Sequence, residues 1–86
     1  MIDVREPHEW EIARVEGADL KPLSQLAAWA GELDPAGGPY VLYCHHGVRS
    51  MHACTALGQQ GVQNLYNLVG GIDRWSREVD SSVPTY

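Results

Sequence analysis

Apolar positions along the chain form two kinds of pattern, short runs bounded by turn residues and stretches with helical spacing. A short apolar run predicts a buried strand, whereas apolar residues spaced three and four apart predict a helix. The predicted strands are residues 2–4, 17–20 (a turn and a brief strand), 40–43 and 64–68. The predicted helices are a short one opened by Pro7, one over 23–33 with Ser24 as candidate cap, one from about 49 to 60, and one over 72–79.

Glycine and proline mark the boundaries between these elements. The segment 34–39 is dense in both and predicts a loop. Gly61 follows the third predicted helix where a left-handed cap is expected, and residues 70–71 separate the last strand from the last helix. There is no internal repeat or linker, so we expect one domain over residues 1–86. Its start inside a strand suggests that an N-terminal lead-in element is missing.

Strands and helices alternate along the chain, and this order predicts an α/β fold. Right-handed crossovers then build a central parallel sheet with helices on both faces. In such sheets, functional sites lie beyond the carboxyl ends of the strands. We therefore expect a functional site at the end of the strand over 40–43.

The composition and charge of the chain exclude some classes of protein and of binding partner. The 86 residues carry a net charge of −5 and no basic run, so we expect no nucleic-acid partner. No apolar stretch approaches the ~20 residues of a membrane helix, and the N-terminus lacks the pattern of a signal peptide. Two cysteines are too few for a disulfide framework, which favours a reducing, cytoplasmic location.

Cys44 stands where the strand over 40–43 ends and the next helix begins. A loop that curls around a cysteine and opens a helix aims backbone N–H groups at the sulfur, and the helix dipole adds partial positive charge. Arg49 adds a full positive charge. All three features favour a thiolate over a thiol, so we predict that Cys44 is a nucleophile with a lowered pKa.

Four residues separate Cys44 from Arg49 and form a predicted cradle. Gly47 permits a backbone geometry that a side chain forbids, and successive inward N–H groups make a nest that suits a thiolate or a persulfide. Ser50, in the first helical turn, adds further donors. Residues 44–52 hold one arginine, three histidines and no acid, which indicates an anion site on an otherwise acidic protein.

The histidines beside Cys44 raise the question of a metal site. Adjacent residues such as His45 and His46 rarely converge with a neighbouring cysteine on one ion, because zinc ligands are usually separated by a few residues. We therefore expect no metal and no cofactor, and interpret both histidines as surface groups of the loop. Cys54 lies on the apolar stripe of its helix and is predicted to belong to the core.

Three segments, in order, resemble the single-domain rhodanese family of sulfurtransferases. Residues 44–50 look like the family's active-site loop, residues 2–10 are similar to its opening motif, and residues 64–75 look like its closing motif. Residues 15–18 match an intermediate turn, except that Glu16 stands where the family commonly has proline. The resemblance covers nearly the whole chain.

The resemblance implies a small α/β fold and a catalytic cycle on Cys44. A donor such as thiosulfate would load sulfur onto Cys44 as a persulfide, and cyanide or a thiol would remove it. A protein of a sulfur relay is a further implied partner. Asp3 and Arg5 match family positions at the base of the site, where a structural ion pair is expected. The substrate-binding residues implied by position are His45, His46, Gly47, Val48, Arg49 and Ser50.

Two other functions are compatible with a cysteine in such a loop. A non-catalytic rhodanese-like module would bind partners or sense redox state, although inactive versions usually lack the cysteine. Cysteine phosphatases also combine a cysteine, a nest and an arginine, but their loop is one residue longer. The cradle between Cys44 and Arg49 is therefore expected to be too small for phosphate, and no aspartate follows at the spacing of a general acid.

Overall fold

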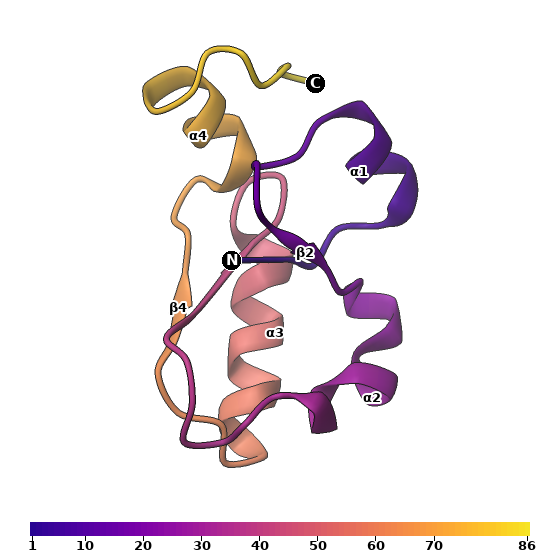
Figure 1. Ribbon diagram of the computed structural model, residues 1–86, viewed down its shortest axis with the longest axis vertical. Helices are drawn as coiled ribbons and strands as arrows, with labels where there is room; N and C mark the ends of the chain where they lie inside the picture. The colour runs from indigo at the N-terminus through magenta and orange to yellow at the C-terminus, as the bar shows by residue number, and fades with distance from the viewer.

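Four short strands form one parallel sheet at the centre of the computed structural model, which describes residues 1–86 (Figure 1). The strands are β1 (Ile2–Asp3), β2 (Asp19–Leu20), β3 (Tyr40–Tyr43) and β4 (Leu65–Asn67). Their order across the sheet is β2-β1-β3-β4, so β1 and β3 are central. In register, Ile2 pairs with Leu42 and Tyr40 pairs with Leu65. The predicted α/β fold with a parallel sheet is confirmed.

Helices connect the strands and flank the sheet. They are α1 (Pro7–Ile12), α2 (Leu26–Trp29), α3 (Val48–Gln59) and α4 (Gly71–Glu78), with 3-10 turns η1 (Leu23–Gln25) and η2 (Ala30–Glu32) on either side of α2. Figure 1 shows α4 and the C-terminal segment at one end of the molecule, with α2 toward the other. The loop between β3 and α3 lies on the side of α4 and α1.

Neighbouring residues of β3 face opposite sides of the sheet, because strand side chains alternate. Leu42 belongs to a core cluster built with α2 and α3, which includes Ile2, Val4, Trp29, Ala53 and Leu57. Tyr43 belongs to a second cluster with Ala13, Val15, Ile72 and Val83. Helices and loops therefore cover both faces of the sheet, as the order of elements predicted.

The continuous helix predicted over 23–33 is wrong, because this segment is divided into η1, α2 and η2. Gln25 leaves the α-helical conformation just before α2, with a φ of −111° and a ψ of 18°, whereas Trp29 ends α2 in the helical region with a φ of −111° and a ψ of −11°. Trp29 is buried, and its indole N–H donates to the carbonyl of Pro22 at 2.8 Å, which bends the segment onto the core. Ser24 caps no helix, and its hydroxyl donates instead to the Glu6 carboxylate at 2.9 Å.

The carboxyl end of β1 holds the buried ion pair that the resemblance implied. Arg5 and Asp3 have fully buried side chains, and Nη2 of Arg5 lies 2.7 Å from Oδ2 of Asp3. Burial of an ion pair is tolerated only when the remaining donors find partners. Arg5 meets this condition by also donating to the carbonyl oxygens of Glu9 and Ala13 at 3.3 and 2.5 Å.

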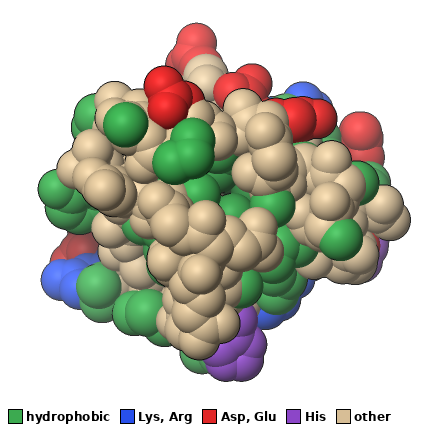
Figure 2. Space-filling view, turned by 90° about the horizontal axis from the view of Figure 1, so that it is seen from below, with side chains coloured by type: hydrophobic (Ala, Val, Ile, Leu, Met, Phe, Trp, Pro, Cys, Tyr) green, Lys and Arg blue, Asp and Glu red, His purple; other side chains and the backbone are tan.

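Charged side chains are dispersed over the surface. On the face shown in Figure 2, Lys and Arg side chains stand apart from one another and form no continuous basic patch. This arrangement agrees with the net charge of −5. None of the helices is both long and apolar enough to cross a membrane.

Candidate active site

Cys44 lies between the carboxyl end of β3 and the first turn of α3, beside the central strand β1. Its side chain is 1% exposed and belongs to the core cluster under α3. Gly47 has a φ of 107°, in the left-handed region that favours glycine, and this lets the chain fold back over the sulfur. The backbone N–H of Gly47 donates to Sγ of Cys44 at 3.0 Å.

A second donor, the Ser50 hydroxyl, reaches the sulfur from inside α3. Oγ of Ser50 is 3.4 Å from Sγ of Cys44 and is also hydrogen-bonded to Oδ1 of Asn67. The amide of Asn67 is held in place because its Nδ2 donates to the carbonyl of Gly47 at 3.0 Å. A hydroxyl has one hydrogen to donate, so Asn67 competes with the sulfur for it, whereas the Gly47 N–H has no such competitor.

The environment of Cys44 favours the anion. Burial alone raises the pKa of its thiol, because a low-dielectric interior penalises charge. Hydrogen bonds from the Ser50 hydroxyl and from the backbone N–H groups of Ser50, Gly47 and His46 outweigh burial and hold the Cys44 pKa below its ordinary value. The predicted direction of the shift is confirmed. Cys54 differs, because burial without such donors raises the pKa of its thiol.

Arg49 directs its guanidinium to Glu9 of α1 and makes no hydrogen bond to Cys44. Its two Nη atoms lie 2.6 and 2.8 Å from the two carboxylate oxygens of Glu9. Such a bidentate pair is geometrically specific. Hydrogen bonding to Glu9 raises the pKa of Arg49, burial opposes this, and the charge of a Cys44 thiolate raises it further. Arg49 therefore interacts with the sulfur through its charge alone. Its hydrogen bonds to Glu9 tie the end of the cradle to α1.

The expectation of a local anion site without acids needs correction, because Glu9 approaches from a distant part of the sequence. Its side chain is about as buried as a core residue, with 10% exposure. The hydrogen bonds from Arg49 lower the pKa of Glu9 from 4.5 to about 2, although burial opposes them. Glu9 is thus ionised at neutral pH and neutralises the Arg49 charge. The groups that donate hydrogen bonds to the Cys44 sulfur are therefore backbone N–H groups and the Ser50 hydroxyl, not the Arg49 guanidinium.

The Glu9–Arg49 pair predicts a specific loss of stability in acid. Since the folded-state pKa of Glu9 is depressed, its contribution is complete above about pH 4.5 and is lost as the pH falls toward about 2. We expect Glu9→Gln to lower the free energy of unfolding by about 2 kcal/mol at pH 7 and by much less near pH 2. Urea unfolding at both pH values measures this difference.

The matched control is Glu32→Gln, because Glu32 forms an ion pair with Lys21 but its side chain is 61% exposed. An exposed pair contributes about 0–1 kcal/mol, so this variant should show a small effect at either pH. A Glu9→Gln difference that stays constant across the same pH range would contradict the role assigned to the pair.

The underside of the cradle rests on the first turn of α4. The carbonyl of Cys44 accepts the N–H of Ile72 at 2.9 Å, and the carbonyl of His45 accepts the N–H of Asp73 at 3.1 Å. Gly71 makes this approach possible: it has a φ of 59°, and a Cβ there would overlap the Cys44 carbonyl and lie 2.5 Å from the His45 oxygen. The closing motif of the sequence therefore supports the loop that holds the nucleophile.

The remaining loop residues differ in exposure. His45 is half-buried, and its ring stacks on that of Tyr86. His46 is exposed, with Nε2 3.9 Å from Oδ2 of Asp73, and Val48 is 65% exposed. The structure thus brings Gly47 and Ser50 to the sulfur by direct hydrogen bonds, whereas the side chains of His46 and Val48 face outward.

One group of side chains has the composition of a metal site. Ligand atoms of His45, His46 and Asp73 all lie within 4.8 Å of one another. Two of the three already have partners: Nε2 of His45 donates to the Tyr86 carbonyl at 2.8 Å, and Oδ2 of Asp73 accepts from Arg77 at 3.2 Å. A cation would have to displace these contacts, and Cys44 is not part of the group.

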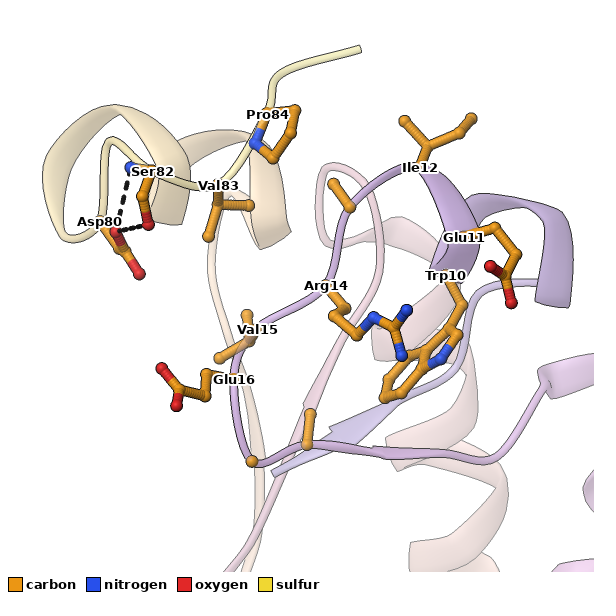
Figure 3. A pocket seen from close by; sticks show the side chains of 13 residues that line it. Trp10, Glu11, Ile12, Arg14, Val15, Glu16, Asp80, Ser82, Val83 and Pro84 are labelled. Carbon is orange, nitrogen blue, oxygen red and sulfur yellow. Dashed lines mark hydrogen bonds between the residues drawn. The ribbon is translucent and has the colours of Figure 1, made fainter.

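The largest groove of the molecule is separate from Cys44. It has a volume of about 580 Å³ and runs between residues 10–18 and residues 80–84. Figure 3 shows Trp10 and Arg14 on one side of it and Val83 and Pro84 on the other. A second hollow of about 340 Å³ does border the cradle, and it is lined by His46, Gly47, Val48, Met51, His52, Asn67, Val69 and Gly70.

Three residues near the site were missed from the sequence: Glu9, Asn67 and Tyr86. Glu9 and Asn67 belong to segments that carry the resemblance, so their motifs could have indicated that both residues lie near the site. Tyr86 lies in a tail without regular structure, and no spacing pattern connects it with the loop.

The fold and the loop define a small parallel α/β domain with an anion-stabilised cysteine at the end of a central strand. A family model described as Rhodanese-like domain matches residues 1–78, and the chain belongs to this family. A rhodanese-related protein from Thermoplasma volcanium has a similar solved structure, with a TM-score of 0.81 and 33% identity. The match covers 91% of this chain and 76% of that one.

Curated relatives include both multidomain and short proteins. Rhodanese-like/PpiC domain-containing protein 12, chloroplastic, of Arabidopsis thaliana is 44% identical over 90 residues, which cover 100% of this chain and 30% of that protein. The probable adenylyltransferase/sulfurtransferase MoeZ of Mycobacterium tuberculosis is 37% identical over 87 residues, with coverage of 100% and 22%. Thiosulfate sulfurtransferase GlpE of Haemophilus influenzae is 30% identical over 77 residues, with coverage of 90% and 72%.

These relatives support a sulfurtransferase role at the level of the family. The chain spans less than a third of the length of the Arabidopsis and Mycobacterium proteins. The Arabidopsis relative is named chloroplastic, and the cytoplasmic location of this chain stays a prediction.

Proposed function

We propose that this chain is a sulfurtransferase that carries sulfane sulfur on Cys44 from a small donor anion to a nucleophilic acceptor. The observation that carries the proposal is the buried Cys44 sulfur, which accepts the Gly47 N–H at 3.0 Å and has a lowered pKa. A thiolate is the nucleophilic form of cysteine. The same inward N–H groups suit the terminal sulfur of a persulfide, which is also anionic.

The reaction proceeds in two displacement steps at sulfur. The Cys44 thiolate attacks the outer sulfur of thiosulfate, the S–S bond of the donor breaks, and sulfite leaves with the bonding electron pair. Cyanide then attacks the terminal sulfur of the persulfide and departs as thiocyanate. The electron pair of the broken S–S bond returns to Cys44 as the thiolate, so the cycle needs no external oxidant or reductant. A thiolate acceptor would leave as a persulfide instead.

Two features of the relatives support the choice of donor and partner. A relative that this chain covers over most of its length is named thiosulfate sulfurtransferase, which favours thiosulfate as the test donor. Others combine a similar domain with additional ones under the name adenylyltransferase/sulfurtransferase. We therefore include a protein of a sulfur relay among the acceptors, alongside cyanide and small thiols.

Incubation with thiosulfate should add one sulfur atom to the protein, as measured by intact mass. Subsequent cyanide should remove that atom and release thiocyanate in equal amount. Because four residues separate Cys44 from Arg49, the cradle should not accept a phosphoryl group, and aryl phosphates should give no turnover. A protein that gains no sulfur although Cys44 can be alkylated would instead be a binding or redox-sensing module. Turnover of aryl phosphate would make it a phosphatase.

A further inference from the structure

Tyr86, the last residue of the chain, contacts the cradle at its first histidine. The rings of Tyr86 and His45 are stacked, with centroids 3.9 Å apart and planes inclined by 4°. Nε2 of His45 also donates to the Tyr86 backbone carbonyl at 2.8 Å. Stacking and hydrogen bonding together fix both the plane and the direction of the His45 ring. His45, the residue that follows the nucleophile, is therefore held by Tyr86.

The hydroxyl of Tyr86 reaches the other end of the cradle through Glu9. It donates to Oε2 of Glu9 at 2.7 Å and accepts from Nη1 of Arg5 at 2.7 Å. Burial raises the pKa of Tyr86, so its hydroxyl is protonated and remains a donor at neutral pH. Glu9 in turn holds Arg49 at 2.6 Å. A single tyrosine thus contacts His45 directly and is linked to Arg49 through Glu9.

The C-terminal segment that carries Tyr86 is anchored to the body of the protein. Val83 is buried in the cluster with Tyr43 and Ile72, and its carbonyl accepts the hydroxyl of Ser76. Arg5, which binds the Tyr86 hydroxyl, is fully buried. Tyr86 itself is 39% exposed, so it contributes less to the core than a buried tyrosine would. Its contacts are directed at the site.

We propose that Tyr86 is a positioning residue, which holds His45 and, through Glu9, Arg49, so that the N–H groups between them stay aimed at the Cys44 sulfur. The inference rests on the proposed function, because N–H donors directed at the sulfur stabilise the thiolate and the persulfide of that reaction. Tyr86 does not touch the reacting atoms. Its effect passes through the geometry of residues 45–49, where preorganised donors stabilise charge without reorganisation.

Two substitutions separate the two contacts. Tyr86→Phe keeps the stack on His45 and removes the hydroxyl, whereas Tyr86→Leu removes both. The matched control is Tyr66→Leu, because Tyr66 on β4 is 57% exposed and its hydroxyl makes no hydrogen bond. Each protein is tested by iodoacetamide alkylation of Cys44 against pH, by the rate of sulfur uptake from thiosulfate, and by thermal unfolding.

We expect Tyr86→Leu to raise the alkylation pKa of Cys44 and to slow sulfur uptake on the order of 10-fold, because misaimed donors stabilise the anion less. Tyr86→Phe should shift both in the same direction by a smaller amount, and Tyr66→Leu should leave both within about twofold of the wild type. The alkylation profile needs no sulfur donor, so it tests Tyr86 even if the wild type takes up no sulfur.

Two results would overturn the inference. One is a Tyr86→Leu protein whose alkylation profile and uptake rate match those of Tyr66→Leu. The other is a Tyr86→Leu protein that unfolds at lower temperature while the Cys44 profile stays unchanged, since that describes a structural residue only. If Tyr86→Leu fails to fold, the Tyr86→Phe profile decides, and an unchanged profile there removes the link through Glu9 and with it the proposal.

Discussion

Replacing Cys44 with alanine should abolish sulfur transfer from thiosulfate to cyanide while the protein stays folded. No other group in the cradle can carry a covalent sulfur, because Ser50 is a buried hydroxyl and Cys54 lies on α3 outside the cradle. The fold should survive, since alanine fits a buried position. Removal of the sulfur leaves the Gly47 N–H without its acceptor, at a cost of about 1–3 kcal/mol. Steady-state kinetics and thermal unfolding measure the two effects.

Cys54→Ala is the matched control for this experiment. Cys54 is partly buried, packs against the core cluster, and its thiol pKa is raised by burial. We expect most of the activity to remain, with a loss of stability of about 1–3 kcal/mol. Turnover by Cys44→Ala, or a loss of turnover confined to Cys54→Ala, would reassign the nucleophile.

Replacing Gly71 with alanine should damage both the fold and the site, although Gly71 lies outside the loop. Its φ of 59° is strained for alanine, and the added Cβ would overlap the Cys44 carbonyl and crowd that of His45. Strain and overpacking together should cost roughly 2–5 kcal/mol. Relief requires the cradle to move off α4, so we expect sulfur uptake to fall on the order of 10²-fold. Urea unfolding and uptake kinetics test both effects.

Gly58→Ala controls for the same chemical change in an open position. Gly58 lies within α3, and a Cβ there meets nothing within 4 Å. Alanine should therefore stabilise the helix by about 0.5–1 kcal/mol and leave sulfur uptake unchanged. If Gly71→Ala were as stable and as active as Gly58→Ala, the first turn of α4 would not be the support of the cradle.

Local patterns predicted much of the fold. The four strands and the helices α1, α3 and α4 lie within one or two residues of their predicted ranges, a difference typical of element ends. Gly61 has a φ of 92° after α3, as its predicted capping role requires. The segment over 23–33 is different, because burial of Trp29 and its bond to Pro22 override helical spacing.

The candidate site was predicted in part. The position of Cys44, the nest and the direction of its pKa shift follow from a few consecutive residues at the junction of β3 and α3. The partner of Arg49 did not follow, because Glu9 is 40 residues away in the sequence. Sequence reasoning therefore assigned the charge of Arg49 to the sulfur, where the structure divides it between the sulfur and a carboxylate.

The sequence by itself determined the alternation of elements, the parallel sheet and the cysteine at a strand end, because each depends on residues that are neighbours in the chain. Only the tertiary structure decided which side chains surround the loop. Glu9 from α1, Asn67 from β4 and Tyr86 from the tail meet there through hydrogen bonds between segments that are far apart in the sequence. Such contacts leave no periodic trace in a sequence, because they depend on how the crossovers bring distant segments together.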